Sequence, residues 1–299
     1  MKKIYLLFFT GFLLALNIFC WREVFVLSRN NDLKVVFFDV GQGDSAFIET
    51  PEGHQIIIDG GPNTALLQKL GKEMPFWDRD IDLVILTHPE KDHMTGLLKL
   101  LELYKVDYFL WTGVAKDGAE NKRLAELLEK TQSKSKNFFL ASLTGFKPTE
   151  IFFAESERDF SAGGAFIDVL SPLENLSGRE VKNTNDSSVV IKLIYGKNGF
   201  IFTGDIGVSV EKKMVSAGID LSADILKVAH HGSKYSTSNE FIQAVKPKIA
   251  VISAGRDNPY GHPTQETLQR LDNFGVRTLR TDQIGDITIL TDGNKIYIQ

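Results

Sequence analysis

The stretch that most constrains this chain is Thr87–His93, which reads Thr-His-Pro-Glu-Lys-Asp-His and directly follows an apolar run at 82–86. The run predicts a buried strand, so two imidazoles and two carboxylates meet where a turn releases the chain from a sheet. These groups suit divalent metal ions, and two ions about 3.5–4 Å apart need a cluster of this density. Alternatively, Asp92 and His93 could form the N-cap of a helix over 94–104. Because capping has no use for four such groups at this spacing, we favour a metal site.

Further Asp and His residues stand at the ends of other apolar runs. Asp59 ends a strand predicted at 55–59, Asp205 follows one at 199–202, and a His-His pair follows one at 224–229. Strand meanders and helices in two similar halves predict two mixed sheets packed face to face with helices outside, an α/β (α+β) fold. Strand ends on one edge of such a sandwich share one cleft, which brings these groups together.

The adjacent His230 and His231 are expected to have different roles. Side chains alternate between the two faces of a strand, so one of the pair should bind metal. We assign His230 to the metal and keep His231 as the alternative; the other ring would contact substrate or orient a ligand. His262 precedes a predicted helix and is a candidate proton donor or phosphate contact. Ser233 and Lys234 are candidate contacts for an anionic substrate.

The N-terminus imposes a separate constraint. Lys2 and Lys3 precede an apolar run from Ile4 to Trp21, which is about as long as a helix needs to be to span a membrane. We expect residues 1–22 to be a signal peptide or an uncleaved signal anchor. The lysines should stay in the cytoplasm, which would place the domain at 33–299 outside it, either anchored to the membrane or secreted. The single cysteine, Cys20, excludes an intramolecular disulfide.

Taken in order, several motifs resemble the metallo-β-lactamase superfamily. They are Asp59-Gly60-Gly61, His88-x-Glu90-x-Asp92-His93, Thr203-Gly204-Asp205 and the strand-terminal His230. The similarity is more specific to the nuclease-like metallo-β-lactamase domain of the ComEC competence proteins. The motifs that look like that subgroup are Phe38–Ser45, Ile58–Gly61, Leu226–Ser233 and Asn258–Pro263.

The chain departs from the superfamily pattern, which is His-x-His-x-Asp-His. Glu90 stands at the second His, and no His lies between His93 and His230, where other members carry one. Asn185 lies roughly at that place. ComEC-like members also carry a carboxylate at the second His position, so Glu90 is consistent with that subgroup.

The resemblance implies a four-layer αββα sandwich with two divalent metal ions and a metal-activated hydroxide that attacks a phosphodiester or related ester. The implied metal ligands are His88, Glu90, Asp92, His93, Asp205 and His230, with Asn185 or water completing one ion. Asp92 and His262 would be catalytic, and Asn185, His231, Ser233 and Lys234 would contact substrate. Asp39, Asp44 and Asp59 would support the ligands from behind. With fewer imidazoles than usual, the ions could be zinc or manganese, with magnesium possible.

The sequence thus predicts a ComEC-like, metal-dependent nuclease or phosphodiesterase that acts outside the cytoplasm on DNA or another phosphodiester. The alternatives are a hydrolase of a different ester or a lactam, and a non-catalytic member that uses the same fold for binding. A net charge of −4 gives no global attraction to nucleic acid, but the local field at a metal cleft matters more. The sequence indicates membrane contact through the N-terminal segment and gives no evidence for a protein partner.

Overall fold

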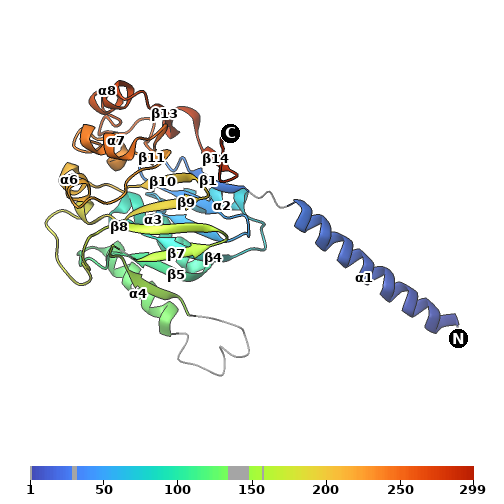
Figure 1. Cartoon of the computed structure of the whole chain (residues 1–299). Helices are drawn as coiled ribbons and strands as arrows, with labels where there is room; N and C mark the ends of the chain where they lie inside the picture. Colours follow the sequence, from blue (N-terminus) through green and yellow to red (C-terminus); the bar gives the residue numbers. More distant parts are fainter. Residues whose placement is uncertain (1, 29–31, 134–147, 157) are drawn as a thin grey trace.

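The computed structural model describes residues 2–28, 32–133, 148–156 and 158–299. Two mixed sheets lie face to face at the centre, and helices cover the outer face of each (Figure 1). The four-layer αββα sandwich predicted from the sequence is therefore confirmed.

The first sheet has eight strands within the described residues, in the order β15-β14-β1-β2-β3-β4-β5-β6. Its members are β1 (Leu33–Phe37), β2 (Ala46–Glu49), β3 (Gln55–Ile58), β4 (Asp80–Ile85), β5 (Lys105–Trp111), β6 (Glu150–Phe153), β14 (Ile287–Thr291) and β15 (Ile296–Ile298). Strands β3 to β6 run parallel, and β2 is antiparallel to both of its neighbours. As a result β1, β3 and β4 all begin at one edge of the sandwich and end at the other.

The second sheet has seven strands in the described part of the chain, in the order β13-β12-β11-β10-β9-β8-β7. They are β7 (Asp159–Ala162), β8 (Ala165–Ser171), β9 (Val190–Tyr195), β10 (Asn198–Phe202), β11 (Ile225–Lys227), β12 (Ile249–Ile252) and β13 (Arg277–Arg280). Strands β10 to β13 are parallel, so the chain leaves β10 and β11 at the same edge.

Three apolar layers hold the sandwich together. Val35 and Phe37 in β1 face the second sheet, whereas Val36 in β1 and Phe38 directly after it face the helices, because neighbouring side chains in an extended chain point to opposite faces. The rings of Phe37 and Phe202 stack between the sheets, with centroids 5.5 Å apart. The outer face of the first sheet packs on α2 (Ala65–Glu73), α3 (Lys91–Leu103) and α4 (Ala119–Ser133). That of the second packs on α6 (Val208–Ser216), α7 (Asn239–Val245) and α8 (Gln265–Asn273).

The chain begins with α1 (Lys2–Ser28), which extends away from the sandwich (Figure 1). Its segment Lys3–Arg22 has a mean hydropathy of 2.0 and is not buried anywhere in the protein. Among the described residues it is the one helix long and apolar enough to cross a membrane. This agrees with the predicted signal or anchor segment.

The start of α3 differs from the capping alternative considered above. The N-cap position is Glu90, and Asp92 and His93 lie in the first turn of the helix. That alternative is therefore wrong, and both side chains are available for other contacts. The helix lies against the 59–61 loop, where the Gly60 amide donates to the His93 carbonyl (2.6 Å) and the Gly96 amide to the Gly61 carbonyl (3.1 Å).

A methyl group at Gly96 should disturb this contact, because it would overlap the carbonyl oxygen of Gly60. We expect Gly96→Ala to lower the free energy of unfolding by about 1–3 kcal/mol, as overpacking does in cores. Gly71→Ala is a matched control, since Gly71 is also helical and nothing lies near its Cβ position; it should change stability by at most about 1 kcal/mol, upward. Urea denaturation measures both, and equal effects would contradict the packing argument.

Candidate metal centre

The chemical groups of the site stand just after the carboxyl ends of four strands, two in each sheet. Asp59 follows β3 and Thr87 follows β4, while Asp205 follows β10 and a histidine turn follows β11. A backbone hydrogen bond from Val189 to the Thr87 carbonyl (2.8 Å) joins the two sets of loops. The cleft is thus built from both sheets.

Four side chains converge at this edge. Asp92, His93, Asp205 and His231 each offer one ligand atom, and these atoms all lie within 4.8 Å of one another. The His93 Nε2 atom is 3.3 Å from Asp205 Oδ1, and His231 Nε2 is 3.4 Å from Asp92 Oδ2. Two imidazoles and two carboxylates at these distances form a donor set suited to a divalent transition metal.

Three imidazoles are held so that the Nε2 atom of each is free to bind. The Nδ1 atom of His93 pairs with Asp59 Oδ2 (2.7 Å), that of His231 with the Ser253 carbonyl (3.0 Å), and that of His88 with the Thr87 hydroxyl (3.0 Å). The three Nε2 atoms are buried without a hydrogen-bond partner. Buried polar atoms rarely stay unpaired, and a histidine that donates through Nδ1 presents its Nε2 lone pair to a metal. The site therefore fits a metal ion.

Asp59 and Thr87 form the support for these rings. The Thr87 amide and hydroxyl both donate to the Asp59 carboxylate, at 2.8 Å each. Asp59 has a left-handed backbone, with φ of 59°, a conformation that costs energy for a non-glycine residue and tends to persist at functional sites. This places the carboxylate behind His93 rather than in the cleft.

The site concentrates negative charge in a buried place. Burial alone would lower the pKa of His93, but Asp205 and Asp59 raise it well above the ordinary value. Burial also lowers the pKa of His231, but Asp205 and Asp44 outweigh this effect and raise the pKa of His231 to about 10. Burial lowers the pKa of His88 to about 3, which leaves that ring neutral. The buried carboxylates are thus stabilised by nearby positive charge, which protonated histidines or a metal ion can supply.

A buried lysine balances one further carboxylate. Lys227, in the middle of an apolar stretch at the end of β11, donates to Asp44 Oδ2 at 2.6 Å. Burial raises and Lys227 lowers the pKa of Asp44, and the net effect is a fall below the ordinary value. The Asp44 carboxylate also lies 3.2 Å from His231 Nδ1, so it supports that ring from behind.

Glu90 has partners of its own. Its carboxylate pairs with the Lys116 ammonium and accepts from the Thr184 hydroxyl. It is not a member of the four-residue cluster. A cation could bind Glu90 only in competition with Lys116.

The two neighbouring histidines do not lie on a strand. β11 ends at Lys227, before the predicted boundary, and His230, His231 and Gly232 follow with φ of 50°, 53° and 83°. Alternation between strand faces therefore does not apply to the pair. His231 is buried in the cluster, while His230 is partly exposed, with Nε2 3.8 Å from Asp205 Oδ2. The structure brings both near Asp205, and the ligand role of each stays a prediction.

The other predicted site residues are not members of the cluster, and Lys234 is exposed. The ring of His262 lies 5.7 Å from that of His230, and its Nδ1 is buried without a partner. Asn185 begins the short 3₁₀ helix η2 (Asn185–Ser187), directly after Thr184. The Ser233 hydroxyl accepts from the Tyr235 amide (3.3 Å), and the Asp39 carboxylate from the Gly41 amide (3.2 Å).

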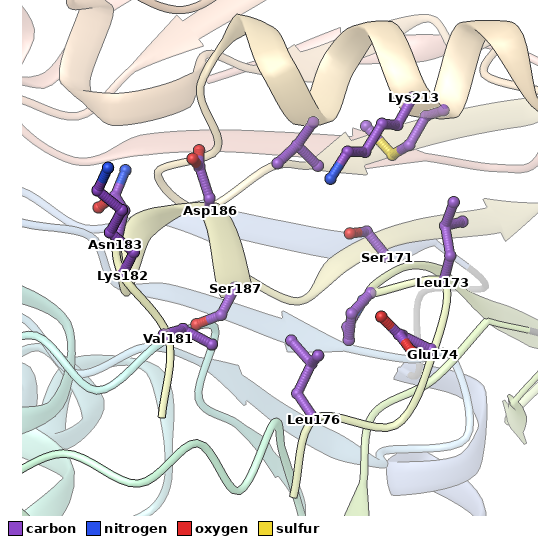
Figure 2. Close-up of a pocket in the computed structure, with 13 residues that line it drawn as sticks. Ser171, Leu173, Glu174, Leu176, Val181, Lys182, Asn183, Asp186, Ser187 and Lys213 are labelled. Carbon is purple, nitrogen blue, oxygen red and sulfur yellow. The ribbon is translucent and has the colours of Figure 1, made fainter. Parts of the chain in front are cut away.

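Two cavities differ in whether they reach the cluster. One, of about 520 Å³, contains Asp92 in its wall together with Lys91, Lys116 and Tyr260. The other, of about 770 Å³, lies between η2 and α6; Figure 2 shows Asp186 and Lys213 on its polar side and leucines opposite. No member of the four-residue cluster lines this larger cavity, whereas Asp92 lines the smaller one. We therefore place the chemistry in the smaller cavity.

Several residues of the site were not singled out from the sequence. They are Thr87, Lys116, Lys227, Ser253 and Tyr260. Lys227 carried a usable signal, because a lysine inside an apolar strand requires a buried carboxylate partner. Ser253 contacts His231 through its backbone carbonyl, and Lys116 reaches Glu90 from a loop that is distant in the sequence. Neither contact could be predicted from the local sequence.

The fold, the cluster and the sequence together define the class of this protein. The sequence profile of the Metallo-beta-lactamase superfamily matches residues 38–256, and the chain belongs to that superfamily. It is a hydrolase-fold protein with a His and Asp cluster suited to metal.

The chain is also similar to bacterial competence proteins. It is 30% identical to ComE operon protein 3 of Bacillus subtilis over 271 residues, or 85% of this chain and 32% of that protein. It is 26% identical to competence protein ComA of Neisseria gonorrhoeae over 85% of this chain and 32% of that protein. It is 27% identical to recombination protein 2 of Haemophilus influenzae over 87% of this chain and 29% of that protein. The chain thus spans about a third of the length of these relatives, and the predicted resemblance to ComEC proteins is confirmed.

Solved structures agree on the fold. The metallo-β-lactamase fold protein YhfI from Bacillus subtilis aligns with a TM-score of 0.54 at 12% identity, covering 88% of this chain and 100% of that one. The metal-dependent hydrolase Tm1679 aligns with a TM-score of 0.50 at 13% identity, covering 83% and 95%.

Cation binding should release protons from this site. Because nearby carboxylates raise the pKa of His231 to about 10 and that of His93 well above its ordinary value, a cation must compete with protons for these two rings. The apparent affinity for Mn²⁺ or Zn²⁺ should rise with pH, by up to about tenfold per pH unit for each proton released. Isothermal titration calorimetry in buffers of different ionisation enthalpy counts the protons, and an affinity that does not change with pH would contradict this.

Proposed function

We propose that this protein is a metal-dependent phosphodiesterase that acts on nucleic acid outside the cytoplasm. The observation that carries the proposal is the convergence of His93 and His231, whose buried Nε2 atoms have no hydrogen-bond partner, with Asp92 and Asp205. Asp92 also lines an open cleft. The similarity to proteins named for competence and recombination supports DNA as the substrate. Those names belong to longer proteins, so the assignment to this chain is our own.

The cluster would hold one cation through Asp92, His93, Asp205 and His231, which are the four residues that lie together. His88 and Asp205 would hold a second, weaker cation, because Glu90 is neutralised by Lys116. When bound, such ions stabilise charge on a phosphoryl group and lower the pKa of water. His231 thereby takes the ligand role first given to His230.

The remaining residues would bind substrate and handle protons. Asp59, Thr87 and Asp44 hold the ligand rings in position and in one tautomer. The His262 ring packs beside the His230 ring, with centroids 5.7 Å apart. We assign to His262 the proton that the leaving oxygen takes up. Asn185, Ser233 and Lys234 are retained as outer contacts to the substrate.

The cleft offers places for a nucleic-acid strand despite the negative net charge. Lys91 and Lys116 line it, each paired with a glutamate that a phosphate could replace. Tyr260 is exposed at its rim, and its ring stacks near His262 with centroids 5.9 Å apart. An exposed ring beside cations is the arrangement by which proteins hold single-stranded nucleic acid.

For localisation we propose that α1 stays attached as a signal anchor. The two lysines before it would remain in the cytoplasm, and the hydrolase domain at 33–299 would lie outside. The net charge of −4 would then have little effect on substrate binding, because the charges that line the cleft act on the substrate at short range.

Hydrolysis of bis(p-nitrophenyl) phosphate and of single-stranded DNA with Mn²⁺ or Zn²⁺ tests this function. Asp92→Ala should abolish cation-dependent hydrolysis and leave the fold intact, because it removes one of four ligands. His231→Ala should weaken cation binding by more than about 100-fold, beyond the range for groups behind a ligand. His230→Ala is the matched control and should weaken it less than about tenfold. Full activity in Asp92→Ala, or a larger loss in His230→Ala, would refute the assignment.

Substrate stacking can be tested at Tyr260. Base stacking on an aromatic side chain contributes about 1–3 kcal/mol, so Tyr260→Ala should raise KM for single-stranded DNA about 5- to 150-fold and affect kcat less. Tyr260→Phe should restore most of the affinity. Tyr297→Ala removes an exposed ring on β15 and should leave KM unchanged. Equal KM values for Tyr260→Ala and the unaltered protein would exclude stacking.

A further inference from the structure

Two neighbouring aromatic side chains are exposed far from the metal centre. Phe76 is 80% exposed and Trp77 is 72% exposed, and their rings meet edge to face with centroids 4.8 Å apart. They pack on each other and leave most of their surface to water. Burying such surface would be favourable by about 25 cal/mol per Å², so a contiguous pair of this size indicates a contact outside the domain.

The pair forms part of a larger apolar rim. Phe76 and Trp77 lie in the loop that joins α2 to β4, and Leu103, 52% exposed, ends α3 at the same side. The Lys105 amide, two residues after Leu103, donates to the Arg79 carbonyl (2.8 Å), two residues after Trp77. We call Phe76, Trp77 and Leu103 the aromatic edge.

The aromatic edge lies where the chain enters the domain from α1. Glu73, the last residue of α2, forms an ion pair of 2.8 Å with Lys34, the second residue of β1. Phe76 is three residues beyond Glu73. Four residues separate the end of α1 at Ser28 from Leu33, and the five Cα-to-Cα steps between these two residues cover at most about 18 Å. The aromatic edge and the membrane helix are therefore held close together by the chain itself.

Charges of both signs lie beside the aromatic edge. Asp78 and Asp80 adjoin Arg79 in the chain, and Lys105 forms ion pairs with Asp107 (2.8 Å) and Asp80 (3.4 Å). Arg79 and Lys105 flank it, with the Arg79 guanidinium 4.9 Å above the Tyr104 ring. Lys72 is exposed on the last turn of α2. Tryptophan and phenylalanine favour the interfacial zone of a bilayer, and lysine and arginine reach from there to lipid headgroups.

We propose that the aromatic edge inserts into the interface of the same bilayer that α1 enters, so that the domain rests on the membrane by the edge opposite its metal centre. A lipid surface is favoured over a protein partner because the edge is continuous with the membrane helix. The inference rests on the proposed retention of α1 as an anchor. Since β1, β3 and β4 begin at the aromatic edge and end at the metal cleft, the cleft would face the aqueous phase.

The full chain in phosphatidylcholine and phosphatidylglycerol vesicles tests this, with Trp77 as the reporter after Trp21→Phe and Trp111→Phe. Lipids brominated in the upper acyl chain should lower Trp77 fluorescence at least about twofold, as for an interfacial tryptophan. Because only lipid is present, quenching cannot come from a protein partner. Vesicle-bound protein whose Trp77 is not quenched would overturn the proposal, and a protein partner would then become the candidate.

A second measurement compares the protein that retains all three tryptophans with a variant of the aromatic edge. Hydrogen exchange of the amides at 76–79 should be slower in vesicle-bound protein than in the Phe76→Ser/Trp77→Ser variant. Tyr235→Ser is the matched control, because Tyr235 is 70% exposed but follows the histidine turn at the metal edge; it should leave that exchange unchanged. Equal exchange in all three proteins would refute the contact.

The outcomes separate the proposals from one another. The Phe76→Ser/Trp77→Ser variant should hydrolyse bis(p-nitrophenyl) phosphate like the unaltered protein, since it lies away from the cleft. A chain that does not float with vesicles contradicts the retained anchor. Absent hydrolysis in every variant contradicts the proposed function and leaves the lipid contact to be decided by quenching and exchange.

Discussion

The structure depends on one electrostatic constraint, the placement of buried carboxylates around histidine rings at the meeting point of two sheets. Asp205 alone would be strongly disfavoured as a buried anion, because removing an unpaired charge from water costs several kcal/mol. His93 and His231 hold its pKa well below the ordinary value in spite of burial. The same rings are bound from behind by Asp59 and the Ser253 carbonyl. Each ring therefore links a carboxylate in the cleft to a fixed group in the core, and a cation can replace the protons without moving either.

This arrangement requires the sandwich. The ligands come from the first turn of α3, from the loop after β10 and from the turn after β11, and the supporting groups come from the loops after β3 and β12. Separation of the sheets would leave Asp205 buried in one layer and His93 in the other. The apolar layer that contains Phe37 and Phe202 thus sets the distance between the ligands. Close packing of Gly96 on Gly60 fixes the position of α3, the helix that carries Asp92 and His93.

The sequence predicted the fold and the convergence because both follow from strand ends. Apolar runs that end in Asp59, His88 or Asp205 place polar groups at one edge, and that edge is the site. The sequence could not rank His230 and His231, since three successive left-handed residues replace the strand that was assumed. It could not show that Glu90 is neutralised, because Lys116 approaches from a loop 26 residues away. Local patterns fix which residues reach the edge, whereas their partners depend on tertiary contacts.

The strands that build the metal centre also fix its height above a membrane. β4 has six residues, and a strand rises about 3.3 Å per residue, so its first and last Cα atoms lie about 17 Å apart. If the aromatic edge rests on the bilayer, a rigid sheet rather than a flexible linker holds the cleft at that distance. A polymer in the aqueous phase then reaches the cleft without crossing the lipid headgroups. A domain tethered by α1 alone would turn freely and would present its cleft to the membrane as often as away from it. With this contact, the exposed Phe76 and Trp77 would have a use that neither folding nor hydrolysis provides.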